Sequence, residues 1–161
     1  MTKLSLAHRV SYESIRSLAI ECHAFDLSAF TLLYEGTHKP SRSTRIAYEE
    51  LVTSKLLLLA IALRTKFCHG ISNPDTVKYV KDCGFLDSTF KGIEAPKLFG
   101  IKDICDKIIH ADEISRILTD GNNGLVTILC GNYQSSIWKF TISMSLFSEG
   151  VLNWLDELPD A

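Results

Sequence analysis

The sequence predicts a mainly α-helical bundle with a two-stranded antiparallel β-hairpin near its C-terminus. Apolar residues recur every three or four positions along most of the chain, as they do on one face of a helix. The clearest such stripe consists of Ile101, Ile104, Cys105, Ile108 and Ile109. The hairpin is predicted by two short apolar segments that follow turns rich in Gly and Asn after residue 120.

Size and composition favour one globular domain that covers residues 1–161. Hydrophobic residues make up 46% of the chain and charged residues 22%. The net charge of −2 gives no global sign of nucleic-acid binding and suits a basic protein partner slightly better. The longest apolar run, 56–63, is far shorter than the ~20 residues of a membrane span, and the N-terminus lacks a signal peptide. We therefore expect a cytoplasmic protein.

The cysteines predict free thiols rather than a disulfide framework or a metal site. The chain has five Cys, an odd number, and contains no Cys-x-x-Cys pair. Buried free thiols are typical of a reducing compartment. A zinc site needs closely paired Cys or His ligands, which are missing here. We expect neither a metal nor another cofactor.

Two long helices are predicted in the first half of the chain. The first spans 9–34, and the second begins at a cap residue, Ser43 or Thr44, and ends near Cys68. Between residues 56 and 63 the second helix is apolar almost all round. Such a helix is buried on more than one side, which makes it either the central helix of a bundle or a dimer helix.

A short third helix and the helix that carries the apolar stripe come next. Asn73 and Pro74 suit the N-cap and first position of the third helix, and Gly84 ends it. Residues 84–100 are expected to be mostly loop. The apolar stripe lies in a helix over 99–111, and a further helical turn is expected from Asp112 to Leu118.

The hairpin follows, and a closing helix completes the chain. Its strands are predicted at 125–130 and 137–143, with a turn that begins at Gly131 and Asn132. Because an isolated two-stranded hairpin is marginally stable, one face must pack on the helices. Trp138 and Phe140 are the expected docking residues. The closing helix spans 145–158.

Arg64 and His69 form the first candidate site, at the end of the second helix. An Arg can stabilise the charge of a phosphorane, and a His can move the proton of an attacking or leaving oxygen. Five residues turn an ideal helix by about 140°, so this pair would need a bend or a frayed end. The simpler interpretation is that Arg64 and Lys66 only stabilise the helix C-terminus by their charge, with His69 at the cap before Gly70.

The second candidate site lies on a flank of the 99–111 helix. Lys107 and His110 are three residues apart and could bind an acidic group or a phosphate. Asp106 is four residues before His110 and could orient its imidazole. The simpler interpretation is a solvated flank with an ion pair between Asp103 and Lys107.

Segments 56–70 and 102–115 resemble a group of small bacterial proteins related to the HEPN helical domains. That group carries a Cys-Asn-Lys-Ile-Ile-His-Ala pattern, and here residues 105–111 read Cys-Asp-Lys-Ile-Ile-His-Ala. Asp106 thus replaces the Asn of the pattern. The resemblance covers about residues 46–158.

The resemblance implies a HEPN-like bundle, commonly a dimer, with one of two kinds of function. Active HEPN members are metal-independent ribonucleases with an Arg-x4–6-His motif, and Arg64 and His69 fit that spacing. Thr65 departs from the polar amide or acid that often follows the Arg, and the motif ends a helix rather than opening one. Other HEPN-like proteins have lost the chemistry and serve as binding modules.

We therefore expect first a non-enzymatic binding protein of a bacterial conflict system, immunity- or antitoxin-like, that neutralises a nuclease toxin. Mild acidity and the absence of a complete catalytic set favour this interpretation. The alternative is a HEPN-type ribonuclease toxin that uses Arg64 and His69 on RNA. A structural partner domain without a toxin, and a homodimer, also stay open. The candidate binding residues are Asp106, Lys107, His110, Asp112, Glu113, Glu149 and Asp156.

Overall fold

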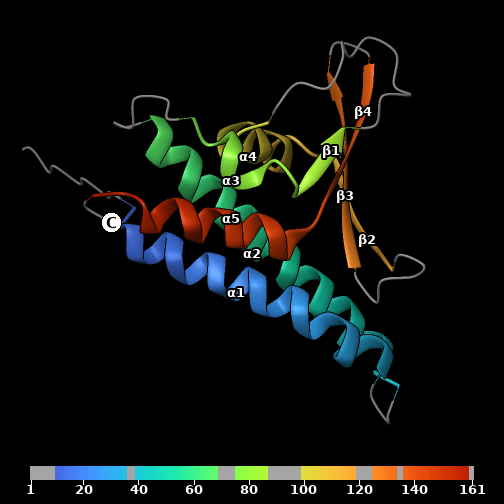
Figure 1. Cartoon of the computed structure of the whole chain (residues 1–161). Coiled ribbons are helices and arrows are strands. Elements are labelled where there is room, and N and C mark those ends of the chain that lie inside the picture. Colours follow the sequence, from blue (N-terminus) through green and yellow to red (C-terminus); the bar gives the residue numbers. More distant parts are fainter. Residues whose placement is uncertain are drawn as a thin grey trace, which may run out of the picture.

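The computed structural model is mainly helical, with one antiparallel sheet packed at an end of the helices (Figure 1). It describes residues 10–35, 39–68, 75–86, 99–118, 125–133 and 136–159. The expected mainly α class is confirmed, but the sheet has four strands rather than only the two of the expected hairpin. None of the described helices combines the length and apolar composition that a membrane span requires.

The two long N-terminal helices pack against each other. Helix α1 covers Tyr12–Phe30 and continues into a π-helical turn, η1, at Thr31–Glu35, and α2 covers Arg42–Cys68. The predicted caps of α2 are wrong: Ser41 Oγ accepts the Thr44 N–H at 3.0 Å, two or three residues earlier than expected. As expected of a central helix, α2 packs against both α1 and α4.

The closing helix, α5, covers Met144–Asp156 and packs along α1. Its Trp154 stacks on Phe67 of α2, with ring centroids 5.2 Å apart. The short helix α3, Val77–Val80, lies on α5, and a Cβ at Gly150 would lie 2.4 Å from the Tyr79 carbonyl oxygen. Gly150 therefore permits this close approach of backbones.

The third helix begins later than predicted. Its first residue is Val77, after Thr76, and the expected cap residues Asn73 and Pro74 lie outside the described residues. Gly84 does not end this helix but begins the strand β1, Gly84–Leu86. The strand pairs with β4, and this long-range pairing has no signature in the local sequence.

The apolar stripe forms helix α4, Ile101–Ile109, as predicted. Four of its five stripe residues are buried against α2 and the sheet, and Ile109 is half-buried. The Asp103 carboxylate accepts the Gly100 N–H at 2.9 Å, and the buried Thr76 hydroxyl accepts the Ile101 N–H at 2.9 Å. These bonds satisfy two of the backbone donors that a helix start leaves without partners. Asp103 is thus an N-terminal cap.

The sheet has the strand order β1-β4-β3-β2, and all neighbouring strands are antiparallel. Strands β3, Leu125–Tyr133, and β4, Ser136–Ile142, form the predicted hairpin. The predicted turn at Gly131 and Asn132 is wrong, because both residues lie within β3 and pair with β4.

Residues 113–118 form the strand β2 rather than the predicted helical turn. Asp112 and Glu113 are acidic residues of the kind that begin helices, which is why the segment was expected to be helical. Side chains in this segment alternate with the two-residue period of a strand, Ile114 and Arg116 on one face and Glu113 and Ser115 on the other. Pairing with β3 therefore makes the segment a strand.

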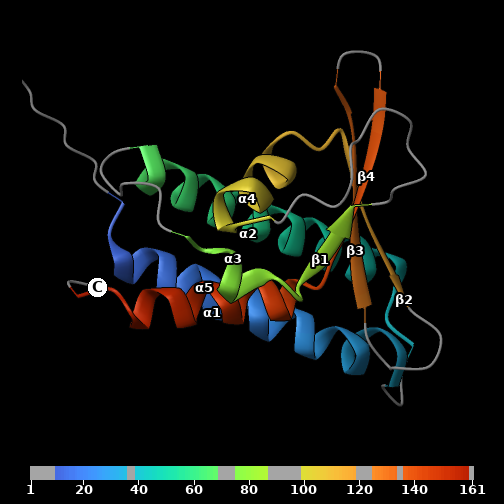
Figure 2. The same ribbon diagram turned by 45° about the horizontal axis from the view of Figure 1, so that its top comes forward.

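The helices cover one face of the sheet only (Figures 1 and 2). Trp138 and Phe140 are buried on that inner face, which confirms them as docking residues. Ile117 and Ile137 are exposed on the outer face. The core therefore lies between the helices and the inner face, and the loop from α4 to β2 lies at its edge.

Candidate binding pocket where α4 meets the sheet

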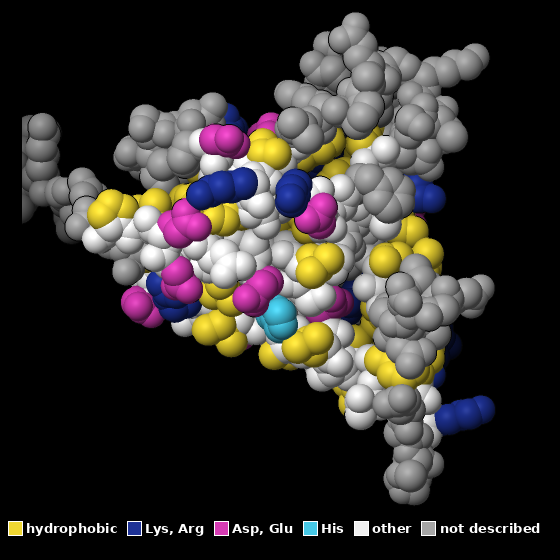
Figure 3. Space-filling view, in the orientation of Figure 1, with side chains coloured by type: hydrophobic (Ala, Val, Ile, Leu, Met, Phe, Trp, Pro, Cys, Tyr) yellow, Lys and Arg dark blue, Asp and Glu magenta, His cyan; other side chains and the backbone are white. Residues whose placement is uncertain are grey.

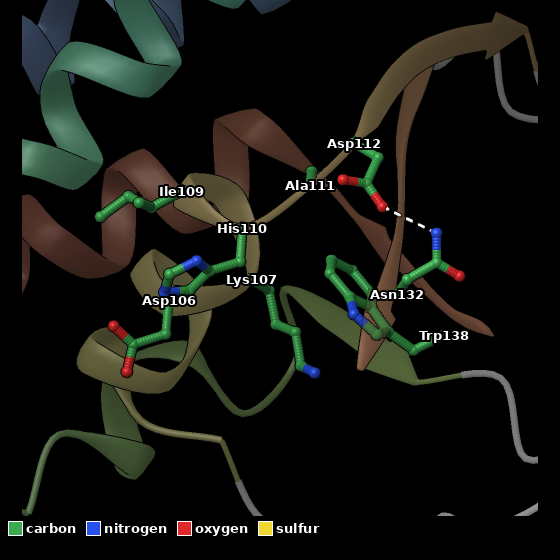
Figure 4. Close-up of a pocket in the computed structure, with 8 residues that line it drawn as sticks. All are labelled: Asp106, Lys107, Ile109, His110, Ala111, Asp112, Asn132 and Trp138. Carbon is green, nitrogen blue, oxygen red and sulfur yellow. Dashed lines mark hydrogen bonds between the residues drawn. The ribbon is translucent and has the colours of Figure 1, made fainter. Parts of the chain in front are cut away.

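A pocket of about 530 Å³ lies where α4 ends and the chain enters β2 (Figure 4). Residues from the end of α4, the connecting loop, β3 and β4 surround it. They are Asp106, Lys107, Ile109, His110, Ala111, Asp112, Asn132 and Trp138. Four of the seven predicted binding residues, Asp106, Lys107, His110 and Asp112, thus come together. The lining combines apolar surface with carboxylate, ammonium and imidazole groups.

The apolar side of the pocket depends on a close approach between Gly131 and Trp138. The two residues are directly paired between β3 and β4. A Cβ at Gly131 would lie 2.3 Å from the Trp138 ring and 2.8 Å from the His110 carbonyl oxygen. Only glycine leaves room for the indole and the end of α4 together. Lys107 Nζ lies 4.3 Å from the centroid of the Trp138 ring, within range of a cation–π interaction.

Asp112 stands on the sheet side of the pocket and has a defined partner. Its carboxylate accepts a hydrogen bond from the Asn132 side-chain amide at 3.0 Å (Figure 4). Its backbone N–H donates to the Cys130 carbonyl at 2.8 Å, which holds the loop to β3. Glu113 follows at the start of β2 and is exposed. Asp112 therefore lies at the pocket's edge, whereas Glu113 is outside the residues that line the pocket.

Asp106 joins the pocket to the end of α2. Its carboxylate accepts a hydrogen bond from Arg64 Nε at 2.5 Å, and this bond is the largest factor that raises the pKa of Arg64. Arg64 also donates to Cys68 Sγ at 3.0 Å. The two candidate sites found in the sequence are therefore neighbours, linked by the Arg64–Asp106 ion pair. His69 lies outside the described residues, so its position relative to Arg64 stays a prediction.

The other two predicted binding residues lie on α5, outside the pocket lining. Asp156 accepts from Arg16 of α1 at 2.5 Å, and Glu149 lies 3.7 Å from His23 of the same helix. Acidic and basic side chains are interspersed over the face that α1, α3 and α5 form (Figure 3). Glu149 and Asp156 thus belong to a mixed surface and sit apart from the four pocket residues.

Sequence reasoning missed two features of the pocket. Asn132 was expected in a turn, and Trp138 was expected only as a core residue. Arg64 and Asp106 were assigned to separate sites, although they form one ion pair. No local signal links them, because Arg64 and Asp106 are 42 residues apart in the chain.

Within the described ranges, no group of His, Cys, Asp or Glu is arranged to hold a metal ion. The chain matches no family model, no curated protein and no solved structure with which it was compared. The HEPN resemblance therefore stays a prediction. What the pocket can do follows from its own chemistry: it can receive a side chain that has an apolar body and a polar or charged end.

Proposed function

We propose that this protein is a non-enzymatic, immunity- or antitoxin-like binding protein of a bacterial conflict system that neutralises a nuclease toxin by direct binding. The observation that supports it is the Arg64–Asp106 ion pair. A phosphodiester-cleaving site needs a cation that can follow the charge of the transition state. Here the carboxylate of Asp106 already neutralises Arg64, the residue that such a mechanism would use.

The pocket suits an anchor residue from a basic partner. Tight protein interfaces concentrate their free energy in a few aromatic or Arg side chains that fill pockets with an apolar floor. Trp138 and Ile109 supply apolar surface, Asp112 supplies negative charge in the lining, and the exposed Glu113 follows it in the chain. Complementary charge also speeds association with a basic nuclease. The Asp106, Asp112 and Glu113 side is therefore the proposed contact surface.

A charge-reversal pair tests this surface. Toxin genes adjacent to the gene for this protein would be expressed with it in a growth assay, and rescue would identify the partner. Glu113→Arg should then weaken both rescue and co-purification, because it reverses an exposed charge of the proposed contact surface, next to Asp112 in the chain. Glu149→Arg is the matched control, since it makes the same change on α5 and should rescue as well as the wild type. Equal behaviour of the two variants would assign the contact to another surface.

A ribonuclease is the second candidate function, and one observation favours it. Lys107 and His110 line the pocket beside the Arg64–Asp106 ion pair, so an ammonium and an imidazole are available there to bind a phosphate once Arg64 leaves Asp106. In this alternative, His69 takes the proton of the attacking 2′-hydroxyl, and the P–O bond to the 5′-oxygen breaks as the 2′-O–P bond forms. Arg64 stabilises the phosphorane charge, while Lys107 or His110 binds the RNA.

Expression of the protein alone separates the two functions. Under the binding proposal, cells that express the wild type grow as well as cells that express the Arg64→Ala/His69→Ala double variant. If only the wild type stops growth and its RNA is cleaved, the ribonuclease function replaces the binding one.

A further inference from the structure

Helix α2 is apolar on two sides, and the residues that the structure describes bury only one of them. Its buried side faces α1, α4 and the core and consists of Tyr48, Val52, Leu56, Leu59, Ala60, Ala62 and Leu63. On the other side Leu51, Leu58 and Ile61 are 43%, 50% and 45% exposed. Single exposed leucines are ordinary, but a row of them along one helix marks an interaction surface.

The exposed row has the spacing of a coiled-coil seam. Its positions alternate by four and three residues along the helix, which is the a/d pattern of heptads. They are Ala47, Leu51, Ser54, Leu58, Ile61 and Thr65, and we call this set the α2 seam. A seam from 47 to 65 is about 27 Å long at the helical rise of ~1.5 Å per residue. Such a row fits another helix laid nearly parallel to its axis.

A groove runs beside the α2 seam on its α1 side. Val10, Ser11, Ser14 and Leu18 line it together with Leu58, Ile61 and Ala62, and its volume is about 430 Å³. Leu58 and Ile61 therefore belong to the seam and also form a wall of the groove. A side chain from a helix docked on the seam can enter this groove, as a knob enters a hole.

We infer that a second copy of this chain covers the α2 seam, with the two α2 helices antiparallel. The seam is complementary to itself in that direction only. Ser54 faces Leu58 of the other copy, so a small residue meets a large one at the centre. Leu51 faces Ile61, and Ala47 faces Thr65, so every layer pairs apolar or small residues. A parallel pair would place Leu58 against Leu58 and Ser54 against Ser54 and would leave a gap at the serines.

The side chains beside the seam are compatible with the same direction. Glu50, Leu57 and Arg64 follow one another at intervals of seven residues along one flank. In the antiparallel pair Leu57 lies against Leu57 of the other copy, and Glu50 lies near Arg64 at each end. The dimer proposed here depends on neither of the two functions above.

The oligomeric state tests the inference. The interface is short, so we expect a reversible dimer with a dissociation constant in the micromolar range. Sedimentation equilibrium of the wild type should show a concentration-dependent dimer, and Leu58→Glu/Ile61→Glu should be a monomer. Leu27→Glu is the matched control, because Leu27 is 65% exposed on α1 outside the seam, and it should dimerise as the wild type does.

Circular dichroism would verify that each variant is folded, and Leu58→Ser/Ile61→Ser repeats the test with smaller changes. A wild-type monomer throughout the concentration range, or equal dissociation of the seam and Leu27 variants, would overturn the inference.

Cross-linking tests the direction of the pair. In a Cys68→Ser background, which removes the exposed native thiol, Ala47→Cys/Thr65→Cys should form covalent dimers with a short bismaleimide. Ala47→Cys alone should not, because antiparallel packing puts the two copies of residue 47 at opposite ends of the seam. Cross-linking of Ala47→Cys alone at the same rate would overturn the antiparallel arrangement.

Discussion

At the scale of single residues, Gly131 controls the shape of the candidate pocket. It is a glycine in the middle of a strand, where the lack of a side chain usually weakens the sheet. Here a side chain would not fit, because the Trp138 ring and the His110 carbonyl occupy the space that a Cβ would need. One hydrogen atom in place of a methyl group thus allows β3, β4 and the end of α4 to meet.

Gly131→Ala should destabilise the protein by about 1–3 kcal/mol, because the methyl group must displace the buried indole or the end of α4. Urea unfolding followed by tryptophan fluorescence measures the change. Lys139→Ala on the neighbouring strand is the control and should change stability by less than ~1 kcal/mol. If Gly131→Ala unfolds at the wild-type midpoint, the close approach seen at Gly131 is not a constraint.

At the scale of elements, the position of β2 depends on a buried ion pair. Arg116 of β2 donates to Asp26 of α1, and their side chains are only 5% and 7% exposed. The other oxygen of Asp26 accepts the backbone N–H of Ser145 at the start of α5, at 2.9 Å. One carboxylate therefore ties β2 to two helices, and these contacts draw residues 113–118 into the sheet.

Arg116→Ala should cost about 3–5 kcal/mol, because it leaves the Asp26 carboxylate buried without its cation. The exposed pair of Arg16 and Asp156 offers a comparison: Arg16→Ala should cost less than ~1 kcal/mol. Chemical denaturation of both variants gives the two values. Similar losses of unfolding free energy in the two variants would mean that the Asp26–Arg116 pair stabilises the protein no more than a surface ion pair does.

At the scale of the whole molecule, the core contains three cysteine thiols. Burial raises the pKa of Cys22 and of Cys83 to about 12, and it also raises the pKa of Cys105. Burial acts in this direction because it disfavours the charged thiolate. Cys68 is exposed at the end of α2. The expectation of buried free thiols is therefore confirmed for Cys22, Cys83 and Cys105. Cys130 is only half-buried, and the expectation is wrong for Cys68, which is exposed.

The protein should lose stability as pH rises above about 9. The folded-state pKa of Cys22 lies above its ordinary value of 9.0, so between pH 9 and about 12 the unfolded chain releases a proton that the native protein keeps. Below pH 9 this contribution is constant. Each such thiol lowers stability by up to ~1.4 kcal/mol per pH unit in that window.

The unfolding free energies of the wild type and of Cys22→Ala would be compared from pH 8 upward. The difference between them isolates the contribution of the Cys22 thiol from that of the other groups that titrate in this range. As pH rises above 9, Cys22→Ala should become more stable relative to the wild type. A difference that is independent of pH would contradict the burial of this thiol.

The sequence by itself determined the helical elements, because their apolar period is local. The stripe of α4, the hairpin strands and the docking of Trp138 and Phe140 were all predicted from spacing. Four of the pocket residues were also singled out in advance, since Asp106, Lys107, His110 and Asp112 lie close together along the chain. The helical period of three to four residues and the strand period of two residues can both be recognised without knowing which distant residues are in contact.

Only the tertiary structure decided which distant residues meet. It made residues 113–118 a strand, extended β3 through Gly131 and Asn132, and placed Arg64 on Asp106. It also left the second apolar side of α2 exposed, although the sequence predicts burial for both sides. The physical reason is common to these cases: strand pairing, ion pairs and helix burial depend on contacts between residues far apart in the chain, which local patterns do not contain.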